Sequence, residues 1–205
     1  MSVVTRGNIS FVPSPTGKGL KLDELSQAYV VLGHVSRSCL VNPSTCRNGF
    51  TISMFVRMEG LNNFKRFFGN SLQGQSGVEI SARNDELNIY VLTNTIRCQY
   101  RNMQCLGTGW HYITFGWRGT GLFNETSQIL VVNGINHPIS IKSKPSCSNV
   151  KEDEVYVPGT DFTLAQQSPQ NTEYDNIAIW YEVLKDKQIK NIFKYARGKS
   201  TYYWR

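Results

Sequence analysis

The amino-acid sequence predicts an all-β fold, in which two antiparallel sheets pack face to face as a jelly-roll sandwich beside one short C-terminal helix. Two observations carry this prediction. About a dozen short segments alternate apolar and polar side chains with the period of a strand, and turn residues separate them. One late segment has helical spacing instead. Because no linker or internal repeat divides the 205 residues, we expect a single domain over residues 1–205.

The clearest strand runs from Trp110 to Gly121. Its side chains alternate between two faces, as strand geometry requires. One face carries His111, Ile113, Phe115 and Trp117, and the other carries Trp110, Tyr112, Thr114 and Gly116. A second apolar run, 128–134, ends in Asn133-Gly134, the strongest short signal for a hairpin turn. The sequence therefore predicts a central strand and then a hairpin whose return strand is 138–141.

The remaining elements are expected in chain order on both sides of this centre. Strands are predicted at 9–12, 20–23, 28–32, 50–58, 64–68, 77–83, 87–92, 161–164 and 174–181. The helix is predicted over Lys185 to Arg197 from one apolar stripe at helical spacing, formed by Ile189, Ile192, Phe193 and Ala196. The lysines of this helix are interpreted as a solvated face rather than as a ligand site.

Composition and charge limit the class of protein. Apolar residues make up 40% and aromatic residues 12% of the chain, which is enough for a packed core. No run approaches the eighteen or so apolar residues of a membrane span, and the first residues lack the apolar core of a signal peptide. A secreted protein would therefore carry this chain as a mature fragment with an added Met1. The net charge of +7 favours polyanionic partners, but no nucleic-acid-binding motif is present, so nucleic acid is not expected.

Five cysteines indicate the cellular compartment. Cys39 and Cys46 are seven residues apart, and Cys98 and Cys105 have the same spacing, which predicts two local disulfides. Zinc is the alternative, but its usual ligand spacing is missing. Disulfides imply an oxidising environment, and hence an extracellular or cell-surface location. Cys147 remains, as a free thiol, a link to another chain, or a replacement for one partner in these pairs. Asn8 and Asn124 begin triplets that match the N-glycosylation pattern.

Four segments, in this order, resemble laminin-G-like and pentraxin-like domains, which belong to the concanavalin-A-like jelly rolls. They are Gly19 to Asp23 with Tyr29 to Leu32; Cys39 to Cys46 leading into Gly49 to Val56; Gly109 to Gly119 with Val131 to Gly134; and Tyr174 to Trp180 with the helix that follows. Phe55 stands where this family usually has Trp. Arg118 and Asn133 stand where the family pattern has acidic residues.

The resemblance implies two packed antiparallel sheets and an extracellular module for binding or adhesion. It also raises the question of calcium, which is frequent in this group. Asp23 and Asp175 match family positions near two ends of the fold and would share one structural ion; the alternative is that Asp175 binds local backbone amides and Asp23 is solvated. No cofactor is otherwise required.

Catalytic residues are not expected. No strand predicted from the sequence carries carboxylates at alternate positions, as jelly-roll glycosidases require, and no Gly-x-Ser-x-Gly motif is present. His111 is interpreted as a hydrogen-bonded core residue rather than a base. Four basic residues would bind sulfated glycans if they met on one rim: Arg97, Arg101, Lys142 and Lys144. We therefore expect a non-catalytic extracellular adhesion or ligand-recognition module. The alternative is a lectin-like carbohydrate-binding domain appended to an enzyme or receptor.

Overall fold

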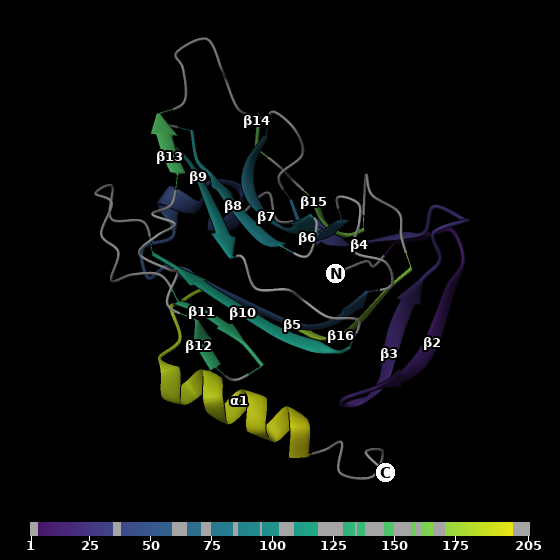
Figure 1. Ribbon diagram of the computed structural model, residues 1–205. Coiled ribbons are helices and arrows are strands. Elements are labelled where there is room, and N and C mark those ends of the chain that lie inside the picture. Colours follow the sequence, from purple (N-terminus) through teal and green to yellow (C-terminus); the bar gives the residue numbers. More distant parts are fainter. Residues whose placement is uncertain are drawn as a thin grey trace.

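The computed structural model describes most of the chain. The described residues are 4–34, 38–58, 65–70, 75–83, 86–94, 96–102, 109–118, 129–133, 135–137, 146–149, 157–158, 161–165 and 171–198. Within them, strands form two antiparallel sheets that face each other as layers, with the helix outside the smaller sheet (Figure 1). The predicted all-β sandwich with one short C-terminal helix is confirmed.

The larger sheet has nine strands in the described residues. In spatial order they are β1 (Val4–Arg6), β4 (Tyr29–His34), β15 (Asp161–Leu164), β6 (Lys65–Gly69), β7 (Gln75–Arg83), β8 (Glu86–Leu92), β9 (Ile96–Asn102) and β13 (Ser146–Asn149), with β14 (Val157–Pro158) paired to β7. All of these pairs are antiparallel except that of β14 with β7. The sequence did not predict β1, β9, β13 or β14.

The smaller sheet has seven strands in the described residues. In spatial order they are β12 (Ile135–His137), β11 (Ile129–Val132), β10 (His111–Trp117), β5 (Phe50–Met58), β16 (Thr172–Trp180), β3 (Gly17–Leu22) and β2 (Ile9–Ser14). The predicted central strand is β10, paired with both β5 and β11. The return strand is β12, directly after the turn at Asn133. The return strand was predicted at 138–141, which lies outside the described residues; pairing with β11 already begins at Ile135, because the turn is tight.

One apolar core fills the space between the sheets. Alternate side chains of β5 point into this core and are fully buried, namely Phe50, Ile52, Met54, Val56 and Met58. Ile113 and Phe115 of β10 lie beside them, and the facing layer contributes Val78 and Ile80 of β7. Burying such side chains contributes about 1.5–3 kcal/mol each to folding. The period-two pattern of the sequence therefore sets which face of each strand points inward.

The helix α1 (Asp186–Gly198) covers part of the outer face of the seven-stranded sheet. The Phe193 ring centroid lies 5.4 Å from that of Tyr112 and 6.5 Å from that of Phe55. The helix begins where the Gln188 side chain accepts a hydrogen bond from the Lys185 backbone N at 2.8 Å. This packing explains why Phe55 and Tyr112, on the outward side of their strands, are nevertheless buried. No helix in the described residues is both long enough and apolar enough to cross a membrane.

Candidate functional site

The first predicted cysteine pair forms a disulfide. Cys39 and Cys46 are joined by an S–S bond of 2.00 Å across two short 3-10 turns, Cys39–Val41 and Pro43–Thr45. The loop docks on the nine-stranded sheet, where Asn70 Nδ2 donates to the Leu40 carbonyl at 3.1 Å and Asn70 Oδ1 accepts from the Val78 N–H at 2.9 Å. The predicted pairing of Cys39 with Cys46 is therefore confirmed.

Cys98 does not lie in a loop. It lies within β9, 6% exposed, with its side chain in the core, and it is disulfide-bonded. The predicted partner, Cys105, lies outside the described residues. In the backbone register of β9 with β13, the residue directly opposite Cys98 is Cys147. The predicted pairing of Cys98 with Cys105 therefore stays a prediction, although Cys98 itself lies in a strand rather than in a loop.

The two candidate calcium ligands lie apart. Tyr174 is opposite Leu20 on adjacent antiparallel strands, so Asp175 continues toward Gly19, whereas Asp23 follows Leu22 at the other end of β3, about four residues away. Four strand residues span about 13 Å, so the two carboxylates cannot share one ion. Asp23 Oδ1 instead accepts from the Leu25 N–H at 3.2 Å. Across the described residues, no group of three or more His, Cys, Asp or Glu side chains is arranged to hold a metal.

The other predicted residues fall in several places. Asn8 is exposed at the start of β2, and Asn124 lies outside the described residues. Arg97 is exposed on β9, and Arg101 lies on the same strand opposite Asn88. Lys142 and Lys144 lie outside the described residues. His111 is only half-buried, with its Nδ1 at 3.2 Å from Asn133 Nδ2, because it lies at the start of β10 rather than inside the core.

Arg97 belongs to a set of polar side chains on the outer face of the nine-stranded sheet. We call this set the Arg97 face, and its members are Glu79, Asn88, Tyr90, Arg97 and Gln99. Glu79, Tyr90 and Gln99 lie directly opposite one another on β7, β8 and β9. Their neighbours along each strand, such as Val78, Ile89 and Cys98, point into the core instead. The register thus aligns polar groups that are distant in sequence.

Contacts within the Arg97 face fix its side chains. Gln99 Nε2 donates to the Tyr90 hydroxyl at 2.8 Å and lies 3.4 Å from Asn88 Oδ1. The Arg97 guanidinium carbon lies 5.8 Å from the Tyr90 ring centroid, within the range of a cation–π contact. An exposed guanidinium, an aromatic ring and an amide therefore converge on one surface. Such a set can bind an anionic group and adjoining hydroxyls.

A buried ion pair lies beside this face. Arg66 Nε and Glu79 Oε2 are 3.6 Å apart, and the Arg66 side chain is only 2% exposed. Burial raises the pKa of the Glu79 carboxyl above its ordinary range, and nearby Arg66 and Arg97 offset part of that rise. Burial likewise lowers the pKa of Arg66. Arg66 therefore places a compensating charge beneath Glu79, and Arg97 remains the exposed cation.

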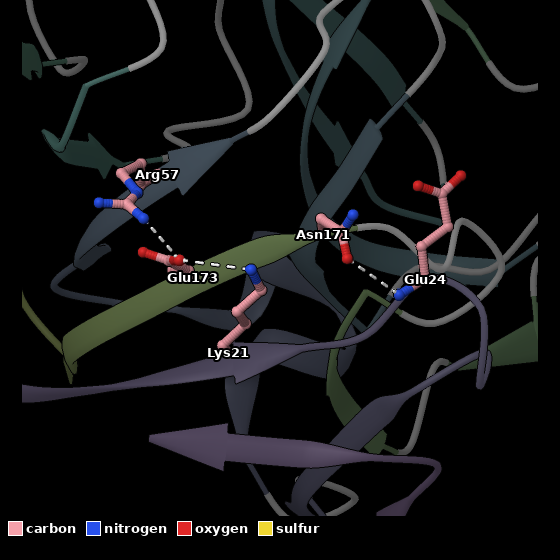
Figure 2. A network of polar contacts seen from close by, with 5 residues as sticks. All are labelled: Lys21, Glu24, Arg57, Asn171 and Glu173. Atoms are coloured by element: carbon pink, nitrogen blue, oxygen red, sulfur yellow. Dashed lines mark hydrogen bonds and ion pairs between the residues drawn. The ribbon is translucent and has the colours of Figure 1, made fainter. Parts of the chain in front are cut away.

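A second polar set lies on the outer face of the other sheet. Lys21, Glu173 and Arg57 are directly opposite one another on β3, β16 and β5, and we call them the Glu173 row. Glu173 Oε1 accepts a hydrogen bond from Arg57 Nη2 at 2.7 Å and lies 3.9 Å from Lys21 Nζ, as Figure 2 shows. Nearby, Asn171 Oδ1 accepts from the Glu24 N–H at 3.4 Å. Glu173 is 2% exposed although it points away from the core.

Trp110 borders the Glu173 row. It precedes β10 and packs against the cluster of Phe55, Tyr112 and Phe193, while its ring centroid lies 5.8 Å from the Arg57 guanidinium carbon. Its indole also reaches β3, because a Cβ built on Gly19 would lie 3.1 Å from Trp110 Cη2. No sequence pattern indicated this grouping, since Glu173 lies just outside the strand predicted at 174–181 and the contacts depend on strand order.

No family model matches the chain, and no curated protein matches it either. Solved structures do. One is a receptor-binding domain with 16% identity and a TM-score of 0.67, covering 95% of this chain and 46% of that chain. The binding domain of botulinum neurotoxin DC, in complex with rat synaptotagmin II, has 15% identity, a TM-score of 0.65 and the same two coverages. A structure on the entry of botulinum neurotoxin type C, described as dependent on two ganglioside molecules, has these same values.

The shared feature is the fold. This chain spans about half the length of the binding domains it matches. At such identities the likeness establishes a β-sandwich that receptor-binding domains also use.

Proposed function

We propose that this chain is a non-catalytic recognition module of a secreted or cell-surface protein, of the laminin-G-like and pentraxin-like kind, and that it binds an acidic glycan through the Arg97 face. The observation that carries the proposal is the exposed Arg97 guanidinium held 5.8 Å from the Tyr90 ring, beside the Gln99 amide. Arginine binds carboxylates and sulfates through two parallel hydrogen bonds. Aromatic and amide groups supply contacts to the neutral part of a sugar.

Further observations support the proposal. The net charge of +7 attracts anions over distance, and so increases the rate of encounter with an acidic ligand. The Cys39–Cys46 disulfide suits an oxidising compartment outside the cytosol. The structural neighbours are receptor-binding domains, one described with a protein ligand and one with gangliosides. These ligands belong to those proteins, and they make recognition a reasonable function for the shared fold.

The test is the binding of sulfated and sialylated glycans to the wild type and to two charge-reversal variants. Arg97→Glu is expected to weaken binding by about tenfold or more, because a charge-assisted hydrogen bond contributes about 1.5–3 kcal/mol. Lys187→Glu is the matched control, since Lys187 is an exposed cation on α1, which covers the opposite sheet. An equal loss of glycan affinity in both variants would show that net charge alone accounts for the binding. Unchanged glycan affinity in Arg97→Glu would show that the Arg97 face is not the binding site.

A protein ligand is the second candidate, and one observation favours it. Phe11 is 75% exposed on β2, the end strand of the seven-stranded sheet. An end strand also presents unpaired backbone groups, so an exposed Phe on it offers a partner both an apolar contact and a strand edge. Phe11→Ser should abolish adhesion to cells while leaving glycan binding unchanged if the ligand is a protein. Unchanged adhesion in this variant would argue against β2 as the contact.

A further inference from the structure

Glu173 is a buried carboxylate whose two oxygens have unequal surroundings. Both cations of the Glu173 row approach Oε1, Arg57 at 2.7 Å and Lys21 at 3.9 Å. Oε2 has no hydrogen-bond partner among the residues that the structure describes. Figure 2 shows the second oxygen turned away from Lys21. A buried acceptor without a donor is costly in free energy, so this atom is suited to bind a donor from a ligand.

The charges around Glu173 restrict the class of that donor. An ammonium group would be repelled by Arg57 and Lys21, which already lie beside the carboxylate. A carboxylate or phosphate offers no donor when ionised, and it would be repelled by Glu173 itself. A neutral hydroxyl can donate a hydrogen bond to Oε2 and is repelled neither by the two cations nor by the carboxylate. The electrostatics of the row therefore select an uncharged, hydroxyl-bearing ligand.

Trp110 supplies the apolar contact that such a ligand needs. Its indole is half-buried, held on one side by Phe55, Tyr112 and Phe193 and on another by the Arg57 guanidinium. Because the Trp110 ring contacts Arg57, which is hydrogen-bonded to Glu173, the indole lies beside the Glu173 row. A pyranose has apolar C–H groups, which can pack on an aromatic ring, and hydroxyl groups, which can donate hydrogen bonds to a carboxylate.

We propose that Trp110 and the Glu173 row form a binding site for a neutral sugar residue, in which a sugar hydroxyl donates to Glu173 Oε2 and the pyranose ring packs on Trp110. The ligand reaches Oε2 from the side away from Lys21, whose Nζ is 3.9 Å from Oε1. Because Oε2 is buried, entry of the ligand requires a shift of the side chains that cover this atom.

This site goes beyond the function proposed above and uses different residues. The Arg97 face lies on the outer side of the nine-stranded sheet, and the Glu173 row lies on the outer side of the seven-stranded sheet. A module with both sites holds two sugar residues on opposite sides of the sandwich. It can then join two glycan chains without forming an oligomer.

The test is a titration of the protein with methyl glycosides of glucose, galactose and mannose, followed by tryptophan fluorescence. The wild type is expected to show a saturable change with at least one glycoside, and Trp110→Phe is expected to lose it. Glu173→Gln should weaken the apparent affinity by about tenfold. Arg97→Glu should leave it unchanged, so that failure of this site and failure of the Arg97 face are distinguishable.

A measurement on the wild type alone keeps the test decisive if Glu173→Gln does not fold. The indole N–H resonance of Trp110 is assigned by comparison with Trp110→Phe, and its shift is followed during the same titrations. Saturable movement of this resonance supports the site. Absence of any saturable change with all three glycosides, or an unchanged affinity in folded Glu173→Gln, would overturn the proposal.

Discussion

The carboxylate of Asp175 binds Thr16, a residue 159 positions earlier in the chain. Asp175 Oδ2 accepts from the Thr16 backbone N at 3.1 Å and from Thr16 Oγ1 at 2.5 Å. The hydroxyl of Ser14 donates to the same oxygen at 2.8 Å. Three protein donors thus saturate one carboxylate oxygen, and they hold the turn between β2 and β3 against β16. This oxygen is a hydrogen-bond acceptor for a turn rather than part of a shared calcium site.

Asp175→Ala is expected to lower the free energy of unfolding by about 2–4 kcal/mol, because three part-buried donors lose an ionised acceptor. Asp23→Ala is the control and should cost less than about 1 kcal/mol, since its carboxylate accepts from the Leu25 N–H in an exposed turn. Urea denaturation with and without calcium measures both. A calcium-dependent rise in stability that disappears in Asp175→Ala would contradict this interpretation.

Glu79 should make stability depend on pH in a predictable direction. Burial raises the pKa of its carboxyl in the folded state, so the folded protein holds the proton more tightly than the unfolded chain. The contribution of Glu79 to the free energy of unfolding is therefore fully present below the ordinary carboxyl pKa of about 4.3. This contribution is lost as pH rises through the raised pKa that Glu79 has in the folded protein. Glu79→Gln removes this titration. The stability of the wild type relative to Glu79→Gln, from urea denaturation, should fall as pH rises through that window. A difference that does not vary with pH would contradict it.

The register of β9 with β13 predicts the second disulfide. Residues opposite each other on antiparallel strands have Cα atoms about 4.5–5.5 Å apart, within the range of about 4.4–6.8 Å that a disulfide spans. We therefore expect Cys98 to be joined to Cys147, which leaves Cys105 as the free thiol. Mass spectrometry of peptides from alkylated, non-reduced protein decides this. Cys147→Ser should cost about 2–4 kcal/mol and Cys105→Ser almost nothing. A peptide joining Cys98 to Cys105 would refute the assignment.

Asn133 should matter both for its backbone and for its amide. It has a positive φ of 52°, its Oδ1 accepts from the Tyr112 N–H at 3.0 Å, and its Nδ2 lies 3.2 Å from His111 Nδ1. Asn133→Gly loses the side-chain contacts but tolerates this backbone, and should cost about 1 kcal/mol. Asn133→Ala adds the left-handed strain and should cost about 2–3 kcal/mol. Thermal and urea unfolding measure the stability of both variants. An equal loss of stability in Asn133→Gly and Asn133→Ala would show that the left-handed backbone at position 133 adds no strain.

The sequence predicted the fold better than the sites, for a physical reason. Alternation is a local property, so β5 and β10 were recognisable, and the two faces of β10 were separated correctly. The strand β9 was missed because the cysteine spacing suggested a loop around Cys98, and its edge partner β13 lies in a polar stretch with no alternation. The strand predicted at 174–181 also differs from a regular strand, because a bulge between Asp175 and Ala178 interrupts the register of β16 with β5, and Tyr181 lies beyond the end of β16 and is exposed.

The candidate sites required information that no local pattern contains. Arg97 was recognised as basic, but its neighbours Tyr90 and Glu79 lie on other strands and depend on the register. Glu173 contacts Lys21 and Arg57, which are 152 and 116 positions earlier in the chain. Asp23 and Asp175 were grouped by resemblance alone, and only the pairing of β3 with β16 shows their separation.

The position of β16 has a consequence for how the protein is made. This strand lies between β5 and β3, so the hairpin of β2 and β3 gains its neighbour in the sheet only after residues 172–180 have been synthesised. The larger sheet has the same property, since β15 joins β4 to β6. During translation, strands from the first four-fifths or so of the chain therefore have unpaired edges until β15 and β16 have been synthesised. Such topologies fold slowly and aggregate readily while incomplete. Truncation before residue 180 should therefore yield insoluble chains rather than a smaller sandwich.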